Sequence, residues 1–529
     1  MNRRHLFVIS DLHLGGRPDV VDDSGNRVPG TSICSSAHLL SGFIDWIGEK
    51  VDRDHECEIE IVLNGDVFDY LCELEEYRPL PQNWSTDEEL ALKICTSLQT
   101  RYPSTSDNEH SAKGSPLRAL RDFLSIGGKL TILIGNHDVE LTFPQVRHWL
   151  KEQLNAGGKK FDFIYDGEAY TVGDVLIEHG NRYDKWNVVD HDRLRRARSL
   201  MSRGLHKQLA ALPLGMRFVP PAGSILVAHV YNNLKQQYRF LDLLKPETEA
   251  VVPLLLTLCP PSVQILSDLV KRLPWISQRL LDTRGSASGR PANGGYLSST
   301  DAAVEPKLKE LLEVALGPGA REFFPEAFEV REVKERIQLS WEAGAPDSSL
   351  YDDLQALGTK LSKVGTFATL LAPATEKQTL QRLHKALLNL PSGRTFDLRA
   401  EDTEYISAAK RILTPGRFKA VVFGHTHLPK YIQISDENNN SQGLYINTGT
   451  WANTMRVPKA CLQEDFYKSR DALRAFARNL AANEYGAYLQ TCACYAELEL
   501  NGGKLASAHL WQFKSVDAPR EQVEMPEVQ

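Results

Sequence analysis

Two histidines separated by one residue follow a short apolar stretch late in the chain. Residues 421–424 read Val-Val-Phe-Gly, and His425 and His427 come directly after them. An apolar run that ends at a glycine predicts a strand whose last side chains lie at the carboxyl edge of a sheet, where open α/β folds bind ligands. Neutral imidazole is the commonest metal ligand, and two histidines so placed can serve one ion or two neighbouring ions. On this stretch alone, a surface loop with two unrelated histidines is an equal alternative.

Four further β-rich runs each end on side chains that can bind a metal ion. The runs are residues 6–10, 59–64, 130–134 and 175–178. The side chains that follow them are, in order, Asp11 and His13; Asp66 and Asp69; Asn136, His137 and Asp138; and His179. One Asp-x-His is common by chance, but five such stretches, each after a predicted strand, are not a chance arrangement. We therefore expect one metal site at a sheet edge.

The five stretches together resemble the calcineurin-like metallophosphoesterase superfamily. Its pattern is D-x-H, G-D-x-x-D, G-N-H-D/E, a later histidine and G-H-x-H. The segments SDLHLGG, GDVFD, HGNRYD and YINTGTW are most similar to the branch that contains UDP-2,3-diacylglucosamine hydrolases. The resemblance covers residues 5–184 and 412–452. It implies an α/β (α+β) fold, a four-layer metallophosphoesterase β-sandwich flanked by helices, and hydrolysis of phosphoester or pyrophosphate bonds.

The resemblance also implies a dinuclear centre. Two divalent ions about 3.5–4 Å apart can clamp a phosphoryl group and activate the water between them. The implied ligands are Asp66 as the bridge, Asp11, His13 and His427 for one ion, and Asn136, His179 and His425 for the other. Nitrogen and oxygen ligands without a thiolate point to Mn²⁺, Fe or Zn²⁺ without ranking them, and we take Mn²⁺ as the first expectation.

His137 is the expected assisting acid. An imidazolium at the mouth of the site can stabilise phosphoryl oxygens or protonate the leaving oxygen. The resemblance implies that Asp69 orients His137 and raises its pKa, and a strand-end cap is the alternative role for this carboxylate. Asp138 is either a helix cap or a support for a ligand. Arg182 is a candidate substrate-binding residue that would bind a phosphate oxygen, or else a salt-bridge partner of the following segment.

The composition is ordinary for a globular protein and limits the partners. The chain has 529 residues, 42% hydrophobic and 24% charged, with a formal net charge of −7. That charge gives no footprint for duplex nucleic acid, so a nuclease, which would need a basic groove near residues 193–198, is possible but not favoured. A binding scaffold without catalysis is the third alternative. The expected substrate is a phosphorylated small molecule or a lipid-linked nucleotide. The sequence carries no indication of oligomeric state.

The location is expected to be cytoplasmic. No apolar run has the length of a signal peptide or a transmembrane segment. The eight cysteines show no framework spacing, and reduced thiols in a cytoplasmic protein account for them.

The elements that must position the site alternate between strand and helix in the first 184 residues, which predicts a sheet covered by helices. Residues 185–411 lack strand alternation and predict a large, mainly helical insertion, a lid or substrate-selecting part, with a flexible linker at residues 283–300. The core, residues 1–184, resumes at 412–514, and residues 515–529 are predicted to be a disordered tail. Predicted helices are residues 37–50, 86–99, 116–124, 193–212, 263–281, 303–315, 380–390 and 462–484. Predicted hairpins pair residues 431–434 with 445–447 and 495–500 with 505–513.

Overall fold

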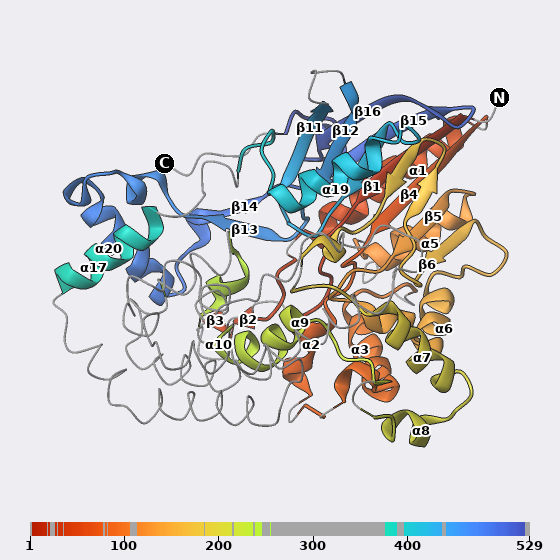
Figure 1. Ribbon diagram of the computed structural model, residues 1–529, viewed down its shortest axis with the longest axis horizontal. Coiled ribbons are helices and arrows are strands. Elements are labelled where there is room, and N and C mark those ends of the chain that lie inside the picture. The colour runs from red at the N-terminus through yellow and green to blue at the C-terminus, as the bar shows by residue number, and fades with distance from the viewer. Residues whose placement is uncertain are drawn as a thin grey trace, which may run out of the picture. The chain divides into compact units, whose positions relative to one another are not determined.

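The chain folds as a mixture of helices and sheets (Figure 1). In this computed structural model, the described residues are 3–17, 20–21, 27–28, 30–34, 36–54, 56–77, 80–81, 83–105, 114–184, 186–213, 216–235, 238–245, 254, 376–388, 396–435 and 441–523. The predicted α/β class is therefore confirmed. The helices predicted at residues 263–281 and 303–315 and the linker at 283–300 lie outside the described residues.

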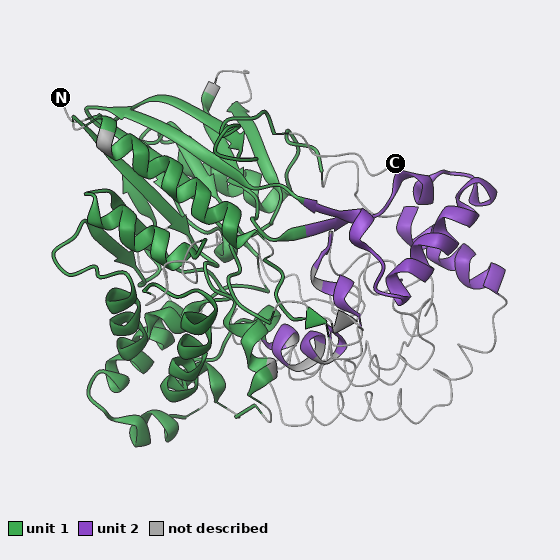
Figure 2. Cartoon of the chain, turned by 180° about the vertical axis from the view of Figure 1, so that it is seen from behind, with its two compact units in different colours: residues 1–224, 393–453, 491–525 green, residues 225–392, 454–490, 526–529 purple. Residues whose placement is uncertain are grey.

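The chain divides into two compact units (Figure 2). Unit 1 is Met1–Ser224, Gly393–Asn453 and Thr491–Met525, and unit 2 is Ile225–Ser392, Thr454–Gln490 and Pro526–Gln529. These boundaries differ from the predicted core of residues 1–184 and 412–514. Unit 1 also contains residues 185–224 and 393–411, whereas residues 454–490 belong to unit 2. Every candidate site residue lies in unit 1.

The larger sheet of unit 1 has six strands in the order β16-β15-β1-β4-β5-β6. Its strands are β1 (Arg3–Ile9), β4 (Cys57–Asn64), β5 (Lys129–Leu133), β6 (Phe161–Ile164), β15 (Cys494–Asn501) and β16 (Lys504–Gln512). Strands β1, β4, β5 and β6 are parallel, so the carboxyl ends of β1, β4 and β5 lie at one edge. Strand β15 is antiparallel to β1 and to β16, which confirms the second predicted hairpin.

The second sheet of unit 1 has five strands in the order β11-β12-β10-β8-β7. Its strands are β7 (Tyr170–Val172), β8 (Val175–Ile177), β10 (Ala420–Phe423), β11 (Pro429–Ser435) and β12 (Ser441–Thr448). Strands β8 and β12 both pair with β10 in parallel, which brings the end of β8 beside the end of β10. Strands β11 and β12 form the other predicted hairpin.

Side chains from both sheets form one hydrophobic cluster. Its buried members are Leu6, Val8, Val62, Leu133, Val172, Val175, Ile177, Ala420, Val422, Leu444, Ile446, Ala496, Leu498 and Leu500. On the other face of the second sheet, helix α19 (Thr403–Leu413) packs Ala409 and Leu413 against Val421 and Phe423. The layers of unit 1 therefore run helix, sheet, sheet, helix (Figure 1).

The alternation of side chains along β1 serves two of these layers. Leu6 and Val8 join the cluster between the sheets, whereas the ring of Phe7 packs against Phe43 and Trp46 of α1 (Ala37–Arg53). Burying a valine, leucine or phenylalanine side chain stabilises a fold by roughly 1.5–3 kcal/mol. A one-residue slip of β1 would exchange its two faces, so burial fixes the register that places Asp11 at the sheet edge.

Shorter elements complete unit 1. They are β2 (Val20–Val21), β3 (Arg27–Val28), α2 (Tyr70–Glu73), η1 (Leu74–Glu76), η2 (Trp84–Thr86), α3 (Glu88–Arg101), α5 (Pro116–Ser125), η3 (Val139–Thr142), α6 (Pro144–Gln153), η4 (Asn181–Tyr183), α7 (His191–Met201) and α8 (His206–Ala210). Helices α1, α3 and α5 lie where helices were predicted. The helix predicted over residues 193–212 is instead broken after α7. Gly204 there has a φ of +68°, and the Leu205 N–H donates to the Leu200 carbonyl at 3.0 Å, which is a Schellman stop.

The described part of unit 2 is mainly helical. Its elements, including those that cross the unit boundary, are α9 (Ala222–Leu226), the π-helix η6 (Val227–Tyr231), α10 (Asn232–Lys235), η7 (Arg239–Asp242), β9 (Leu244–Lys245), α17 (Glu376–Leu388), β13 (Asn453–Arg456), η11 (Lys459–Leu462), α20 (Phe466–Ala481), η12 (Gly486–Tyr488) and β14 (Leu489–Thr491). Helix α17 falls on the helix predicted at 380–390. The helix predicted over residues 462–484 corresponds to α20 with η11 before it.

The predicted disordered tail needs correction for residues 515–523. Glu521 forms a β-bridge with Gln512, with both N–H···O distances 3.0 Å. Arg520 donates to the buried carboxylate of Glu497, with Nε 2.8 Å from Oε2. These contacts hold the segment against β15 and β16, and residues 524–529 lie outside the described residues.

No helix among the described residues is long and apolar enough to cross a membrane. The described cysteines, which are Cys34, Cys57, Cys72, Cys95, Cys461, Cys492 and Cys494, are all free thiols.

Candidate metal centre

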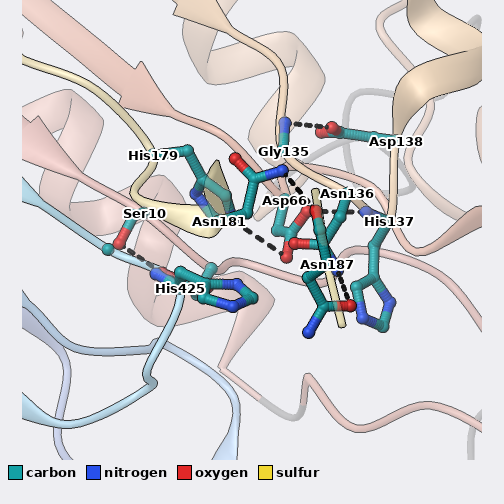
Figure 3. A network of polar contacts seen from close by, with 12 residues as sticks. Ser10, Asp66, Gly135, Asn136, His137, Asp138, His179, Asn181, Asn187 and His425 are labelled. Atoms are coloured by element: carbon teal, nitrogen blue, oxygen red, sulfur yellow. Dashed lines mark hydrogen bonds and ion pairs between the residues drawn. The ribbon is translucent and has the colours of Figure 1, made fainter. Parts of the chain in front are cut away.

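The carboxyl ends of parallel strands in both sheets bring the predicted ligands together, and Figure 3 shows four of them, Asp66, Asn136, His179 and His425. The six-stranded sheet supplies Asp11 and His13 after β1, Asp66 after β4 and Asn136 after β5, and the five-stranded sheet supplies His179 after β8 and His425 and His427 after β10. Segments far apart in the sequence thus meet at one place, as the strand-end pattern predicted.

The ligand atoms fall into two groups that share Asp66. One group is Asp11, His13, Asp66 and His427, and the other is Asp66, His179 and His425; within each group the atoms lie within 4.8 Å of one another. Bonds of about 2.0–2.3 Å to one ion hold its ligand atoms within roughly 4.6 Å of each other. Each group is therefore about the size of a site that could hold a metal ion, and Asp66 belongs to both groups.

The backbone is strained at the candidate ligands. Seven non-glycine residues in the described part of the chain have a positive φ, and five of them belong to the two groups: Asp11, His13, Asp66, His425 and His427, with φ between 46° and 71°. The other two are Asn155 and Asn483, a residue type that tolerates this region. Each strained residue costs of order 1–3 kcal/mol, and such residues concentrate at functional sites. These turns redirect the chain sharply after β1, β4 and β10, so that the side chains there meet the other candidate ligands.

Two motif glycines leave room for the ligands. A Cβ atom on Gly65 would lie 2.5 Å from the ring of His179, and one on Gly135 would lie 2.7 Å from Cγ of Asp66. Ordinary van der Waals contact is 3.4 Å or more. The glycines of G-D and G-N-H are thus required because a ligand that follows another strand, β8 for Gly65 and β4 for Gly135, fills the space of their missing side chains.

Buried ligand atoms without a hydrogen bond show that the site fits a cation. Oδ1 of Asn136 and Nε2 of His179 are buried and lack a hydrogen-bond partner within the described part of the chain. Such an atom costs about 1–3 kcal/mol. In His179 the other ring nitrogen, Nδ1, lies 2.8 Å from the Asn64 carbonyl and carries the proton there. Nε2 is left facing Oδ2 of Asp66, 3.2 Å away, so a proton or a cation is needed between these two atoms.

The charges at the site are mutually dependent. Burial alone would raise the pKa of Asp66, but His179, His137 and His13 hold it well below its usual range. Burial alone would lower the pKa of His179, but Asp66 and Asp11 raise it to about 10. Nε2 of His13 lies only 2.9 Å from Nε2 of His427, so a proton or a cation is needed between the two nitrogens. The pocket of carboxylates and imidazoles therefore requires positive charge.

Asp69 caps a helix and lies beside two rings of the site, and its predicted effect on the pKa of His137 stays a prediction. Its Oδ1 accepts the Cys72 N–H at 2.9 Å, which caps α2, and lies 3.3 Å from Nδ1 of His137. Its Oδ2 lies 3.5 Å from Nδ1 of His13. Burial alone would raise the pKa of Asp69, but His137 and His13 lower it well below its usual range, so the carboxylate is charged and can orient both rings.

Asp138 supports the loops that carry the ligands. Its Oδ1 accepts the Gly135 N–H and its Oδ2 accepts the Val67 N–H, both at 2.7 Å, and its side chain makes no cap hydrogen bond to η3. Burial and the neighbouring Asp66 raise the pKa of Asp138 to about 7. Of the two predicted roles, the structure shows the support.

Arg182 contacts its own unit. Its guanidinium donates to the Gly167 carbonyl, and Nε lies 3.1 Å from Glu178. The predicted contact of Arg182 with substrate stays a prediction.

Three residues beside the ligands were not assigned from the sequence. Ser10 donates to Oδ2 of Asp11 at 2.5 Å and lies 2.7 Å from the Thr448 hydroxyl. Asp184 lies 3.1 Å from Nε2 of His425, and Asn187 accepts from Asn136 at 3.3 Å. Only Ser10 carries a sequence signal, because it is the last residue of a predicted strand, directly before a ligand.

The comparisons with known proteins add no relative. No protein-family model matches the chain, and no curated protein matches it.

Proposed function

We propose that this chain is a dinuclear-metal-dependent hydrolase of phosphoester or pyrophosphate bonds, a member of the calcineurin-like metallophosphoesterases. One observation carries the proposal: two buried groups of ligand atoms share Asp66 at the carboxyl ends of parallel strands from two sheets. The strained backbone at five of these residues supports it.

The family resemblance implies two ions, and the grouping of the ligand atoms supports that division. Asp11, His13 and His427 would hold one ion, Asn136, His179 and His425 the other, and Asp66 both. Bound there, two divalent cations supply positive charge for the phosphoryl oxygens and acidify an attacking water. The nitrogen and oxygen ligands point to Mn²⁺, Fe or Zn²⁺ without ranking them, and we take Mn²⁺ as the first expectation. We expect a phosphorylated small molecule or a lipid-linked nucleotide as substrate.

His137 is placed to handle the leaving group's proton. The backbone N–H of His137 donates to Oδ1 of Asp66 at 2.8 Å, which fixes the backbone of His137 beside the proposed bridging carboxylate. Because Nδ1 faces Asp69, the proton that can be exchanged with a substrate is on Nε2. Its side chain is 20% exposed, against 2% for His179, so it can reach a bound phosphate ester.

Helix α7 gives no specific support for a nuclease. Arg198 donates to the Tyr165 carbonyl at 2.5 Å, and Arg193 pairs with Asp190 at 3.2 Å. The arginines that made a nucleic-acid groove conceivable are thus engaged with neighbouring residues of their own unit.

Metal-dependent turnover tests the proposal. Protein stripped with a chelator should not hydrolyse bis(p-nitrophenyl) phosphate or p-nitrophenyl phosphate, and two equivalents of Mn²⁺ should restore turnover. Asp66→Asn should lose turnover and bind both ions more weakly, because a neutral amide bridges two cations poorly. Hydrolysis that is unaffected by the chelator, or full activity of Asp66→Asn with two ions bound, would refute the function.

A further inference from the structure

A short turn directly after His179 is closed by its own side chains. The Asn181 amide donates to the Asn187 carbonyl at 2.8 Å. Oδ1 of Asp184 accepts the Trp186 N–H at 2.9 Å, and the Asp184 carbonyl accepts the Asn187 N–H at 2.9 Å. The Gly223 N–H also donates to the Trp186 carbonyl at 2.8 Å, which holds the turn from outside. Asp184 and Asn187 thus have fixed positions before any ligand is considered.

Side chains of this turn link two candidate ligands of the second ion. Nδ2 of Asn136 donates to Oδ1 of Asn187 at 3.3 Å, and Nδ2 of Asn187 donates to Oδ2 of Asp184 at 2.6 Å. The same Oδ2 lies 3.1 Å from Nε2 of His425. These contacts join the loop after β5 to the loop after β10, which come from different sheets; Figure 3 shows Asn136, Asn187 and His425 among the residues involved.

The chemistry of this chain of contacts fixes every group in it. An ionised carboxylate only accepts hydrogen bonds, so Asp184 obliges Asn187 to present its NH₂ and His425 to carry a proton on Nε2. Asn187 must then present its carbonyl oxygen to Asn136, which donates its NH₂. Two atoms remain for a cation, Oδ1 of Asn136 and Nδ1 of His425. The first of these is among the buried atoms that lack a hydrogen-bond partner in the described part of the chain.

We propose that Asp184 and Asn187 are positioning residues for the second ion: they turn the amide oxygen of Asn136 and the Nδ1 lone pair of His425 toward it. The inference rests on the proposed function, because it presupposes the two ions. Neither residue belongs to the groups of ligand atoms around Asp66. Residues that orient metal ligands typically change metal affinity by 10–100-fold when they are lost.

Titration of metal-free full-length protein with Mn²⁺ tests this, with electron paramagnetic resonance as the second readout. Wild type should bind two ions and show the spectrum of a spin-coupled pair. Asp184→Ala and Asn187→Ala should bind the first ion as wild type does, bind the second about 10–100-fold more weakly, and show a single uncoupled ion at one equivalent and above. Asp184→Asn, whose amide oxygen can still accept from His425, should recover part of the affinity.

A matched control separates positioning from general damage. Asp190 caps α7 a few residues further on, where its Oδ1 accepts the Arg193 N–H at 2.9 Å. Asp190→Ala should lower the stability of the fold through the lost N-cap and leave the affinities for both ions unchanged. Circular dichroism verifies the fold of each variant, and Asp184→Asn keeps the test open if an alanine variant unfolds.

Each outcome decides the inference. Variants that bind two ions with wild-type affinity and keep the coupled spectrum overturn it while the proposed function stands. An equal loss of affinity for both ions overturns the inference as well. So does an effect of Asp190→Ala as large as that of Asp184→Ala. Wild type that binds fewer than two ions overturns the proposed function and this inference together.

Discussion

Gly135→Ala should damage the metal centre through one added methyl group. Gly135 has no positive φ, so alanine suits its backbone and the effect is steric. The new Cβ would lie 2.6 Å from the backbone nitrogen of Asp66 and 2.7 Å from its Cγ, whereas ordinary contact begins at 3.4 Å. Asp66 must therefore move by about 1 Å, a misplacement that costs roughly 10²-fold in rate, and the overpacking costs about 1–3 kcal/mol of stability.

Gly157→Ala is the control for this change, because a Cβ there meets no atom of the described residues within 4 Å and Gly157 too has no positive φ. We would measure urea unfolding, Mn²⁺ affinity by calorimetry, and turnover of bis(p-nitrophenyl) phosphate for both variants. Gly135→Ala should lower the affinity for both ions, since both groups of ligand atoms share Asp66. Gly157→Ala should match wild type in all three measurements. If Gly135→Ala binds two ions with unchanged affinity, the steric reasoning and the bridging role of Asp66 are both wrong.

Two further predictions follow from other contacts. His137→Ala should keep both ions and lose about 10²–10⁴-fold in turnover, and loss of an ion in its metal analysis would show that His137 is a ligand instead. Glu497 concerns stability: burial alone would raise its pKa, but hydrogen bonds from His5 and Arg520 lower it to about 2. Because the folded-state pKa is lowered, this carboxylate stabilises the fold above the unfolded pKa of about 4.3, and the stabilisation is lost as the pH falls toward 2. Wild type should therefore lose about 1–3 kcal/mol more than Glu497→Gln between pH 5 and pH 2 in urea unfolding, after allowance for screening of the exposed Arg520. Parallel pH curves for the two proteins would contradict this.

The strand ends could be predicted from the sequence because their signals are local. A β-rich run followed within a few residues by Asp66 or His179 carries both the element and the ligand. The parallel order of β1, β4 and β5 then brings these ends to one edge. The strand-end positions of these residues therefore sufficed to predict most of the residues of the candidate site.

Features that depend on distant partners could not be predicted. The contact of Arg520 with Glu497 orders a segment whose composition is typical of disorder. Asp184 and Asn187 have no spacing signal, since their partners Asn136 and His425 are distant in sequence. The break after α7 has a local cause, Gly204. The helical periodicity on both sides of this glycine led to the prediction of one continuous helix.

The central claim is that two ions share Asp66. Diffraction data collected at the manganese absorption edge from Mn²⁺-loaded crystals test it most directly. We predict two anomalous peaks about 3.5–4 Å apart on either side of the Asp66 carboxylate, one beside His427 and one beside His179. A single peak, or peaks away from Asp66, would contradict the account.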